Sequence, residues 1–233
     1  MKATGEVMAI GTSFEQAIMK AVRGAEISLD TLNHPKFEEM SVEQLRAELP
    51  KMTDERLFVV YQALKKGISV DEIYAVTKID EWFLCKLLHL AGYEASITGK
   101  KITRAQYLEG KKLGYTDKAL ARFSGEKLPS HRRAVFKMVD TCAAEFSAKT
   151  PYFYSTYDEL EHDEALPFVQ NSQKKRIIVI GSGPIRIGQG IEFDYSSVHC
   201  VWTLKELGYE VVIINNNPET VSTDFDTADR LYF

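Results

Sequence analysis

Side chains that could bind a polar ligand are concentrated in one glycine-rich segment, residues 181–195. Its glycines are Gly181, Gly183, Gly188 and Gly190, and its charged or amide side chains are those of Arg186, Gln189, Glu192 and Asp194. Glycine permits positive φ in a tight turn and lets backbone N–H groups approach an anion. The segment therefore predicts either a polar cavity or passage, or a loop whose carboxylates only cap a helix.

Two strands must position these side chains. Residues 176–180 form an apolar run that enters the glycine-rich segment, and residues 210–215 form a second run that ends before Asn216-Asn217-Pro218-Glu219. A strand, a glycine loop, a crossover and a parallel strand make one α/β nucleotide-fold unit, in which ligands bind at the carboxyl ends of the strands. We therefore expect Glu219 to lie at the same sheet edge as the glycine-rich segment, while Asn216 could simply hold a turn.

The glycine pattern departs from the fingerprint of a dinucleotide site. That fingerprint requires Gly-x-Gly-x-x-Gly and an acidic residue at the end of the second strand. Position 186 is arginine, the second strand ends in Asn215, and Pro184 lacks a backbone N–H. These departures argue against NAD binding. A P-loop is excluded because no Gly-Lys-Ser/Thr follows the strand.

The middle of the chain has helical periodicity. Four capping-box pairs are Ser13 with Gln16, Ser41 with Gln44, Ser69 with Glu72, and Thr103 with Gln106. Glycines placed where helices would need a left-handed C-terminal residue are Gly67, Gly92, Gly114 and Gly125. The pattern predicts short helices up to about residue 138, with Trp82 and Phe83 in a helix-on-helix core.

The expected fold class is α plus α/β, with a multi-helix all-α domain followed by a partial Rossmann-like parallel β unit. Four aromatic residues between positions 152 and 157 predict an ordered, packed segment. The acidic and then polar composition of residues 158–173 is typical of a linker.

Composition excludes several classes of protein. A net charge of −4 argues against a general attraction to nucleic acid or anionic membranes. No apolar run is long enough to span a membrane, and the start of the chain lacks the apolar core of a signal peptide. Three scattered cysteines, Cys85, Cys142 and Cys200, fit reduced thiols in a cytoplasmic protein, and the five histidines have no metal-ligand spacing.

The longer context of the glycine segment is similar to a known family. Residues 181–195 and 217–233 resemble the large subunit of carbamoyl phosphate synthetases, at the start of its second half. Residues 1–11 resemble the end of the first half's ATP-grasp domain, and residues 79–84 and 139–146 resemble landmarks of the helical domain between the halves. The resemblance implies an internal part of that subunit: residues 1–26 as the end of the first ATP-grasp half, 27–157 as the helical oligomerisation domain, 158–173 as a linker, and 174–233 as the start of the second pre-ATP-grasp domain.

The resemblance also implies a function. This family of ligases makes carbamoyl phosphate for pyrimidine or arginine biosynthesis from bicarbonate, two ATP, and ammonia from a glutamine amidotransferase small subunit. ATP and Mg or Mn would serve the full-length enzyme. Neither is expected to bind residues 1–233, which contain no ATP-grasp core and should be inactive alone.

Residues matching the family's carbamate tunnel are Arg186, Gly190, Glu192 and Glu219. By resemblance, a small Gly190 would keep the passage open, and the carboxylates would accept hydrogen bonds from a passing intermediate. The helical domain would carry self-association.

Other interpretations stay open at the level of sequence. One is a stand-alone helical assembly or binding module with a structural α/β tail, and another is an independent nucleotide-binding enzyme. Residues 62–90 have the cadence of a helix-turn-helix, but residues 53–93 hold five Lys and Arg against six Asp and Glu. Residues 100–138 hold eleven Lys and Arg against three Asp and Glu, which suits a solvated or docking face better than a nucleic-acid site.

Overall fold

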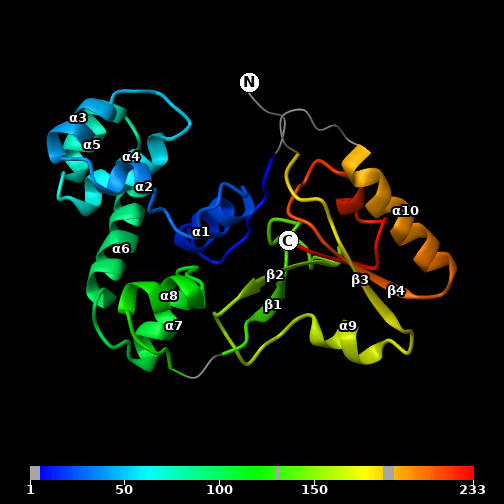
Figure 1. Cartoon of the computed structure of the whole chain (residues 1–233). Coiled ribbons are helices and arrows are strands. Elements are labelled where there is room, and N and C mark those ends of the chain that lie inside the picture. Colours follow the sequence, from blue (N-terminus) through cyan, green and yellow to red (C-terminus); the bar gives the residue numbers. More distant parts are fainter. Residues whose placement is uncertain (1–5, 130–131, 186–191) are drawn as a thin grey trace. The chain divides into compact units, whose positions relative to one another are not determined.

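The computed structural model describes residues 6–129, 132–185 and 192–233 (Figure 1). The chain forms two compact units. The helical unit comprises Ser13–Arg23 and Ile27–His131, and the α/β unit comprises the segment up to Thr12, Gly24–Glu26 and Arg132–Phe233. No helix within the described residues has both the length and the apolar character that crossing a bilayer requires.

The helical unit contains the expected run of short helices. They are α1 (Phe14–Gly24), α2 (Pro35–Glu38), α3 (Val42–Glu48), α4 (Arg56–Lys65), α5 (Val70–Thr77), α6 (Glu81–Ile97), α7 (Arg104–Lys112) and α8 (Asp117–Ser124). Of the four predicted capping boxes, those of Ser41 and Thr103 are complete, whereas Ser69 caps α5 by accepting the N–H of Glu72 alone. Gly125 ends α8 with φ of 70°. The local signals for helix starts therefore act as the sequence indicates.

Two features of the helical prediction are wrong. Gly92 lies inside α6, which continues to Ile97, because apolar side chains on both sides of the glycine keep that helix packed. Trp82 and Phe83 are 53% and 43% exposed, so they are not core residues. Their rings instead meet the ring of Phe14 edge-on, at centroid distances of 5.5 and 5.3 Å.

A buried carboxylate ties the helical unit together. Glu94 is 1% exposed and accepts hydrogen bonds from Asn33 and Tyr115, each at 3.0 Å. Its second oxygen pairs with Lys65 at 2.9 Å. Burial first, and the negative charge of Glu94 second, raise the pKa of Tyr61. The charge is thus surrounded by donors, as a buried carboxylate requires.

The α/β unit contains a five-stranded sheet. Its elements are β1 (Val135–Met138), β2 (Tyr152–Thr156), α9 (Leu166–Asn171), β3 (Arg176–Ile180), α10 (Glu192–Glu206), β4 (Glu210–Ile214), the 3-10 turn η1 (Val221–Thr223) and β5 (Arg230–Tyr232). The strand order is β1-β2-β5-β4-β3; β1 is antiparallel to β2 and the other pairs are parallel. The predicted parallel pair and its helical crossover are confirmed.

Residues 132–157 differ from their expected place in the helical region. The last helix of the helical unit ends at Ser124, and β1 and β2 extend the sheet of the α/β unit. The aromatic segment supplies the reason: Phe153 is fully buried and stacks on Tyr232 of β5, with centroids 5.3 Å apart. Part of the expected linker is helix α9, whose Phe168 packs on Phe153.

Side chains that alternate along the strands divide the sheet into two faces. Val211, Ile213 and Leu231 are buried together with Val201 of α10, so α10 covers one face. Phe153 and Tyr232 lie on the other face, where α9 packs. Helices α9 and α10 thus cover the two faces of the sheet. The candidate site lies at the carboxyl ends of β3 and β4 (Figure 1).

Candidate functional site

Asn215 is the centre of the carboxyl edge. It directly follows β4, and its side chain is 3% exposed. Its Oδ1 accepts hydrogen bonds from the backbone N–H groups of Gly183 and Asn217, both at 3.2 Å. Its Nδ2 donates to the hydroxyls of Thr220 at 3.2 Å and Ser222 at 3.0 Å. One amide thus joins the glycine-rich segment to the loop after β4.

The glycines make this approach possible. A Cβ on Gly181 would lie 2.6 Å from Cβ of Asn215, which no real side chain allows. Gly183 has φ of 70°, in the left-handed region, and its carbonyl accepts a hydrogen bond from Asn217 at 3.3 Å. The N–H of Gly181 donates to the carbonyl of Ile214 at 2.8 Å. The two glycine N–H groups described here are therefore used within the protein, which supports the argument against a nucleotide cradle.

The loop after β4 is held by its own polar side chains. Asn217 is 1% exposed, and its Oδ1 accepts the N–H of Glu219 at 3.0 Å. Hydroxyls of Thr220 and Thr223 donate to the carbonyl of Asn217 at 3.1 and 3.2 Å. The turn is therefore fixed by Asn217, while the carboxylate of Glu219 extends from it into solvent.

The predicted site residues fall into two groups. Arg186, Gly188, Gln189 and Gly190 lie outside the described residues. Glu192 is exposed at the first position of α10, and Asp194, two positions later in the same turn, is buried. Oδ2 of Asp194 accepts the N–H of Ser222 at 2.7 Å, so this carboxylate links α10 to η1.

The chain's N-terminal segment also reaches this edge. The N–H of Met8 donates to the carbonyl of Asn216 at 2.7 Å, and Nδ2 of Asn216 donates to the carbonyl of Gly24 at 3.4 Å. A Cβ on Gly24 would lie 2.5 Å from that nitrogen. Sequence reasoning missed this contact, because its partners are about 200 positions apart and no local signal marks a single backbone pairing.

An ionic cluster lies at the amino ends of β3, β4 and β5, opposite the candidate site. Glu210 is buried and pairs with the equally buried Arg230 and with Arg176. Burial raises the pKa of Glu210, but hydrogen bonding to Ser172 and the charges of the two arginines outweigh it and lower the pKa overall. The two arginines offset the buried charge of Glu210 at the amino ends of the strands, although Nε of Arg230 is buried without a hydrogen-bond partner.

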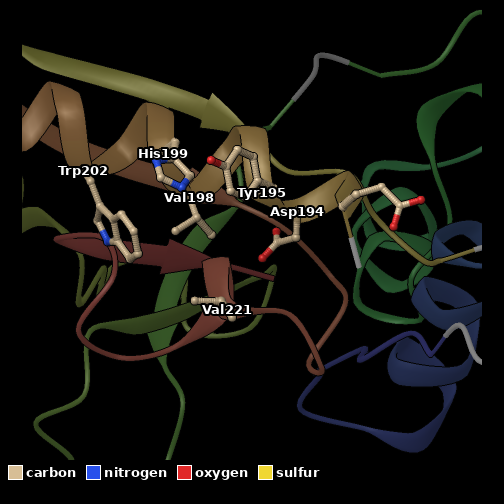
Figure 2. Close-up of a pocket in the computed structure, with 7 residues that line it drawn as sticks. Asp194, Tyr195, Val198, His199, Trp202 and Val221 are labelled. Carbon is tan, nitrogen blue, oxygen red and sulfur yellow. The ribbon is translucent and has the colours of Figure 1, made fainter. Parts of the chain in front are cut away.

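A cavity of about 510 Å³ lies beside the edge, between α10 and η1 (Figure 2). Glu192 and Asp194 line it, together with Tyr195, Val198, His199, Trp202 and Val221. Among the described residues, no three His, Cys, Asp or Glu side chains gather as ligands for a metal ion. The site therefore offers carboxylates and aromatic rings, and we assign no nucleotide or metal chemistry to it.

Comparisons with known proteins match both parts of the chain. The sequence model of the carbamoyl-phosphate synthetase large chain oligomerisation domain matches residues 6–139, and that of the carbamoyl phosphate synthase preATP-grasp domain matches residues 173–233. Carbamoyl phosphate synthase large chains that resemble the whole chain include those of Lachnoclostridium phytofermentans (47% identical), Clostridium acetobutylicum (46%) and Methanobrevibacter smithii (48%).

Each of these alignments covers 100% of this chain but only 22% of the relative. The chain thus spans about a fifth of the length of the curated relatives it matches. Since the oligomerisation-domain model alone matches more than half of the residues, the chain belongs to the carbamoyl-phosphate synthetase large chain family.

Proposed function

We propose that this chain works as an internal part of a large chain that makes carbamoyl phosphate from bicarbonate, ammonia and two ATP. The observation that carries the proposal is 46–48% identity to named large chains along the whole of the sequence. Ammonia would come from a glutamine amidotransferase small subunit. ATP with Mg or Mn would bind elsewhere in the large chain, and residues 1–233 would be inactive alone.

The helical unit would supply self-association. Support comes from the description of the matched domain as an oligomerisation domain over residues 6–139. The resemblance would place residues 1–26 at the end of the first ATP-grasp half, although the matched oligomerisation domain already begins at residue 6. The sheet would assign β1 and β2 to the pre-ATP-grasp domain, because these strands pair with β3–β5, although the matched oligomerisation domain includes β1. The helical domain would then end near residue 131, where the compact helical unit ends, rather than at residue 157 as the sequence suggested.

The carboxyl edge would form part of the passage for carbamate. Glu219 supports this role because Asn217, itself held by Asn215, accepts its backbone N–H while its carboxylate stays exposed. Glu192 lies at the start of α10 with its side chain also exposed. A carboxylate held on a rigid turn can accept a hydrogen bond from a passing intermediate without reorganising. By the family resemblance, Arg186 and Gly190 would complete the proposed lining.

A chimera tests the proposed function. The matching segment of the L. phytofermentans large chain is replaced by this chain, and carbamoyl phosphate formation is assayed with ammonia as nitrogen donor. We expect a working enzyme. A folded chimera that is inactive, beside an active parent, would overturn the assignment.

The passage is tested in the same chimera with Glu219→Ala. Bicarbonate-dependent ATP hydrolysis is expected to continue while less carbamoyl phosphate is formed per ATP consumed. Glu206→Ala, which removes an exposed carboxylate from the last turn of α10, should leave that ratio unchanged. An unchanged ratio for Glu219→Ala would refute the role of Glu219 but leave the family function intact.

A further inference from the structure

The cavity between α10 and η1 contains a carboxylate that the protein leaves partly unsatisfied. Asp194 is only 2% exposed and lines the cavity. Its Oδ2 accepts the N–H of Ser222, but its Oδ1 is buried and has no hydrogen-bond partner. A buried acceptor without a partner destabilises the protein. A ligand N–H that donates to Oδ1 would remove that cost and therefore bind favourably.

Aromatic rings form one wall of the same cavity. Tyr195, His199 and Trp202 follow each other along α10, with ring centroids 4.1 Å apart for the first pair and 5.2 Å for the second. Figure 2 shows the three rings in a row above Val221, with the carboxylate of Asp194 at the end of the row. Tyr195 and Trp202 are 64% and 46% exposed, so their faces remain open to a ligand.

The charge of the lining selects the kind of ligand. Among the described residues, the lining includes two carboxylates, Glu192 and Asp194, and neither lysine nor arginine. Phosphates and other anions would be repelled, whereas cations are attracted both by carboxylates and by aromatic faces. A volume of about 510 Å³ is within the range of small-molecule sites.

We propose that this cavity binds an organic cation that carries N–H donors on a flat body, such as an amidinium or a guanidinium. One N–H would donate to Oδ1 of Asp194, and the flat body would lie along the rings of His199 and Trp202. The apolar side chains of Val198 and Val221 would exclude water from the hydrogen bond. The site shares Glu192 with the proposed passage, but its main ligand-binding groups are Asp194 and the aromatic row, neither of which the passage uses.

The first test uses four probes with the whole chain. Benzamidine carries the cation, benzamide is its neutral counterpart, benzoate is its anionic counterpart, and acetyl-Gly-Arg-Gly-amide presents a guanidinium on a peptide. The readout is the NMR signal of the Trp202 indole N–H in a Trp82→Phe background, which leaves one tryptophan. Saturable shifts with benzamidine or the arginine peptide, and none with benzamide or benzoate, are expected. Whichever of the two cationic probes binds more tightly shows whether the natural ligand is a small molecule or an arginine side chain of a peptide.

The second test removes the charge. Asp194→Asn keeps an acceptor for Ser222 and should weaken binding of the cationic probe about tenfold or more. Glu206→Gln removes one carboxylate from the same helix outside the cavity and should change nothing. If Asp194→Asn fails to fold, Trp202→Ala takes its place, with calorimetry as readout and the same expected loss. Equal binding of benzamide and benzamidine, unchanged affinity in these variants, or no binding of either cation would overturn the proposal.

Discussion

Replacement of Asn215 by alanine should destabilise the α/β unit by about 3 kcal/mol. The change removes the acceptor for two backbone N–H groups, those of Gly183 and Asn217. A buried donor left without a partner costs about 1–3 kcal/mol; we assign about 2 to the fully buried Asn217 and about 1 to the half-buried Gly183. The hydroxyls of Thr220 and Ser222 lie 3.3 Å apart and can pair with each other, so they add little.

Urea unfolding measures this loss unit by unit. The chain has two tryptophans, Trp82 in the helical unit and Trp202 in the α/β unit. In a Trp82→Phe background, fluorescence follows the α/β unit alone, and at an m-value of about 1.5 kcal/mol/M its midpoint should fall by about 2 M. In a Trp202→Phe background, the midpoint of the helical unit should stay in place.

Two variants control the reasoning. Asn215→Asp keeps the acceptor and should lose less than half as much stability as Asn215→Ala. Asn171→Ala, at an exposed position in the last turn of α9, should change stability by no more than about 0.5 kcal/mol. If alanine and aspartate at position 215 destabilise equally, the two backbone donors do not carry the energy and the reasoning is refuted.

Three further predictions concern single positions. Gly181→Ala should destabilise the α/β unit by about 2 kcal/mol, because its Cβ would meet Asn215 at 2.6 Å; an unchanged urea midpoint would contradict this. Glu94→Gln should lower the stability of the helical unit by about 2 kcal/mol through loss of the ion pair with Lys65, as read from that unit's tryptophan; no loss would show that the charge is dispensable. Burial lowers the pKa of Lys20 from 10.5 to about 8, so between these pH values the unfolded state binds a proton that the folded state does not, and stability should rise as pH increases. Lys20→Met should lack this rise. A Lys20 pKa near 10.5, measured by NMR of ¹³C-methylated lysines, would refute the prediction.

Local patterns predicted most of the helical unit. Capping residues and i, i+3, i+4 spacing act within one helix, so Ser41 and Thr103 could be read without knowing the rest of the fold. The exposure of Trp82 and Phe83 could not be read in this way. A large aromatic pair predicts burial, but the degree of burial depends on which neighbours pack there. Among the aromatic rings of the described residues, only Phe14 meets both.

The first two strands show why tertiary pairing escapes sequence reasoning. β1 has four residues and β2 has five, too few for a clear alternation of polar and apolar positions. β2 pairs with β5, whose residues Leu231 and Tyr232 lie almost 80 positions later. The aromatic cluster around Phe153 correctly predicted a packed segment. No feature of the local sequence indicated which sheet this segment joins.

Asn215 shows how the site departs from the fold's nucleotide-binding use. At this position the dinucleotide fingerprint has a carboxylate, which only accepts hydrogen bonds when ionised. The amide both accepts and donates, and here it accepts from Gly183 and Asn217 while donating to Thr220 and Ser222. An amide in place of the carboxylate therefore removes the partner of a ribose hydroxyl and joins the glycine-rich segment to the loop after β4. The amide also occupies the N–H of Gly183, which a phosphate would otherwise need, so the loop is fixed by the protein itself.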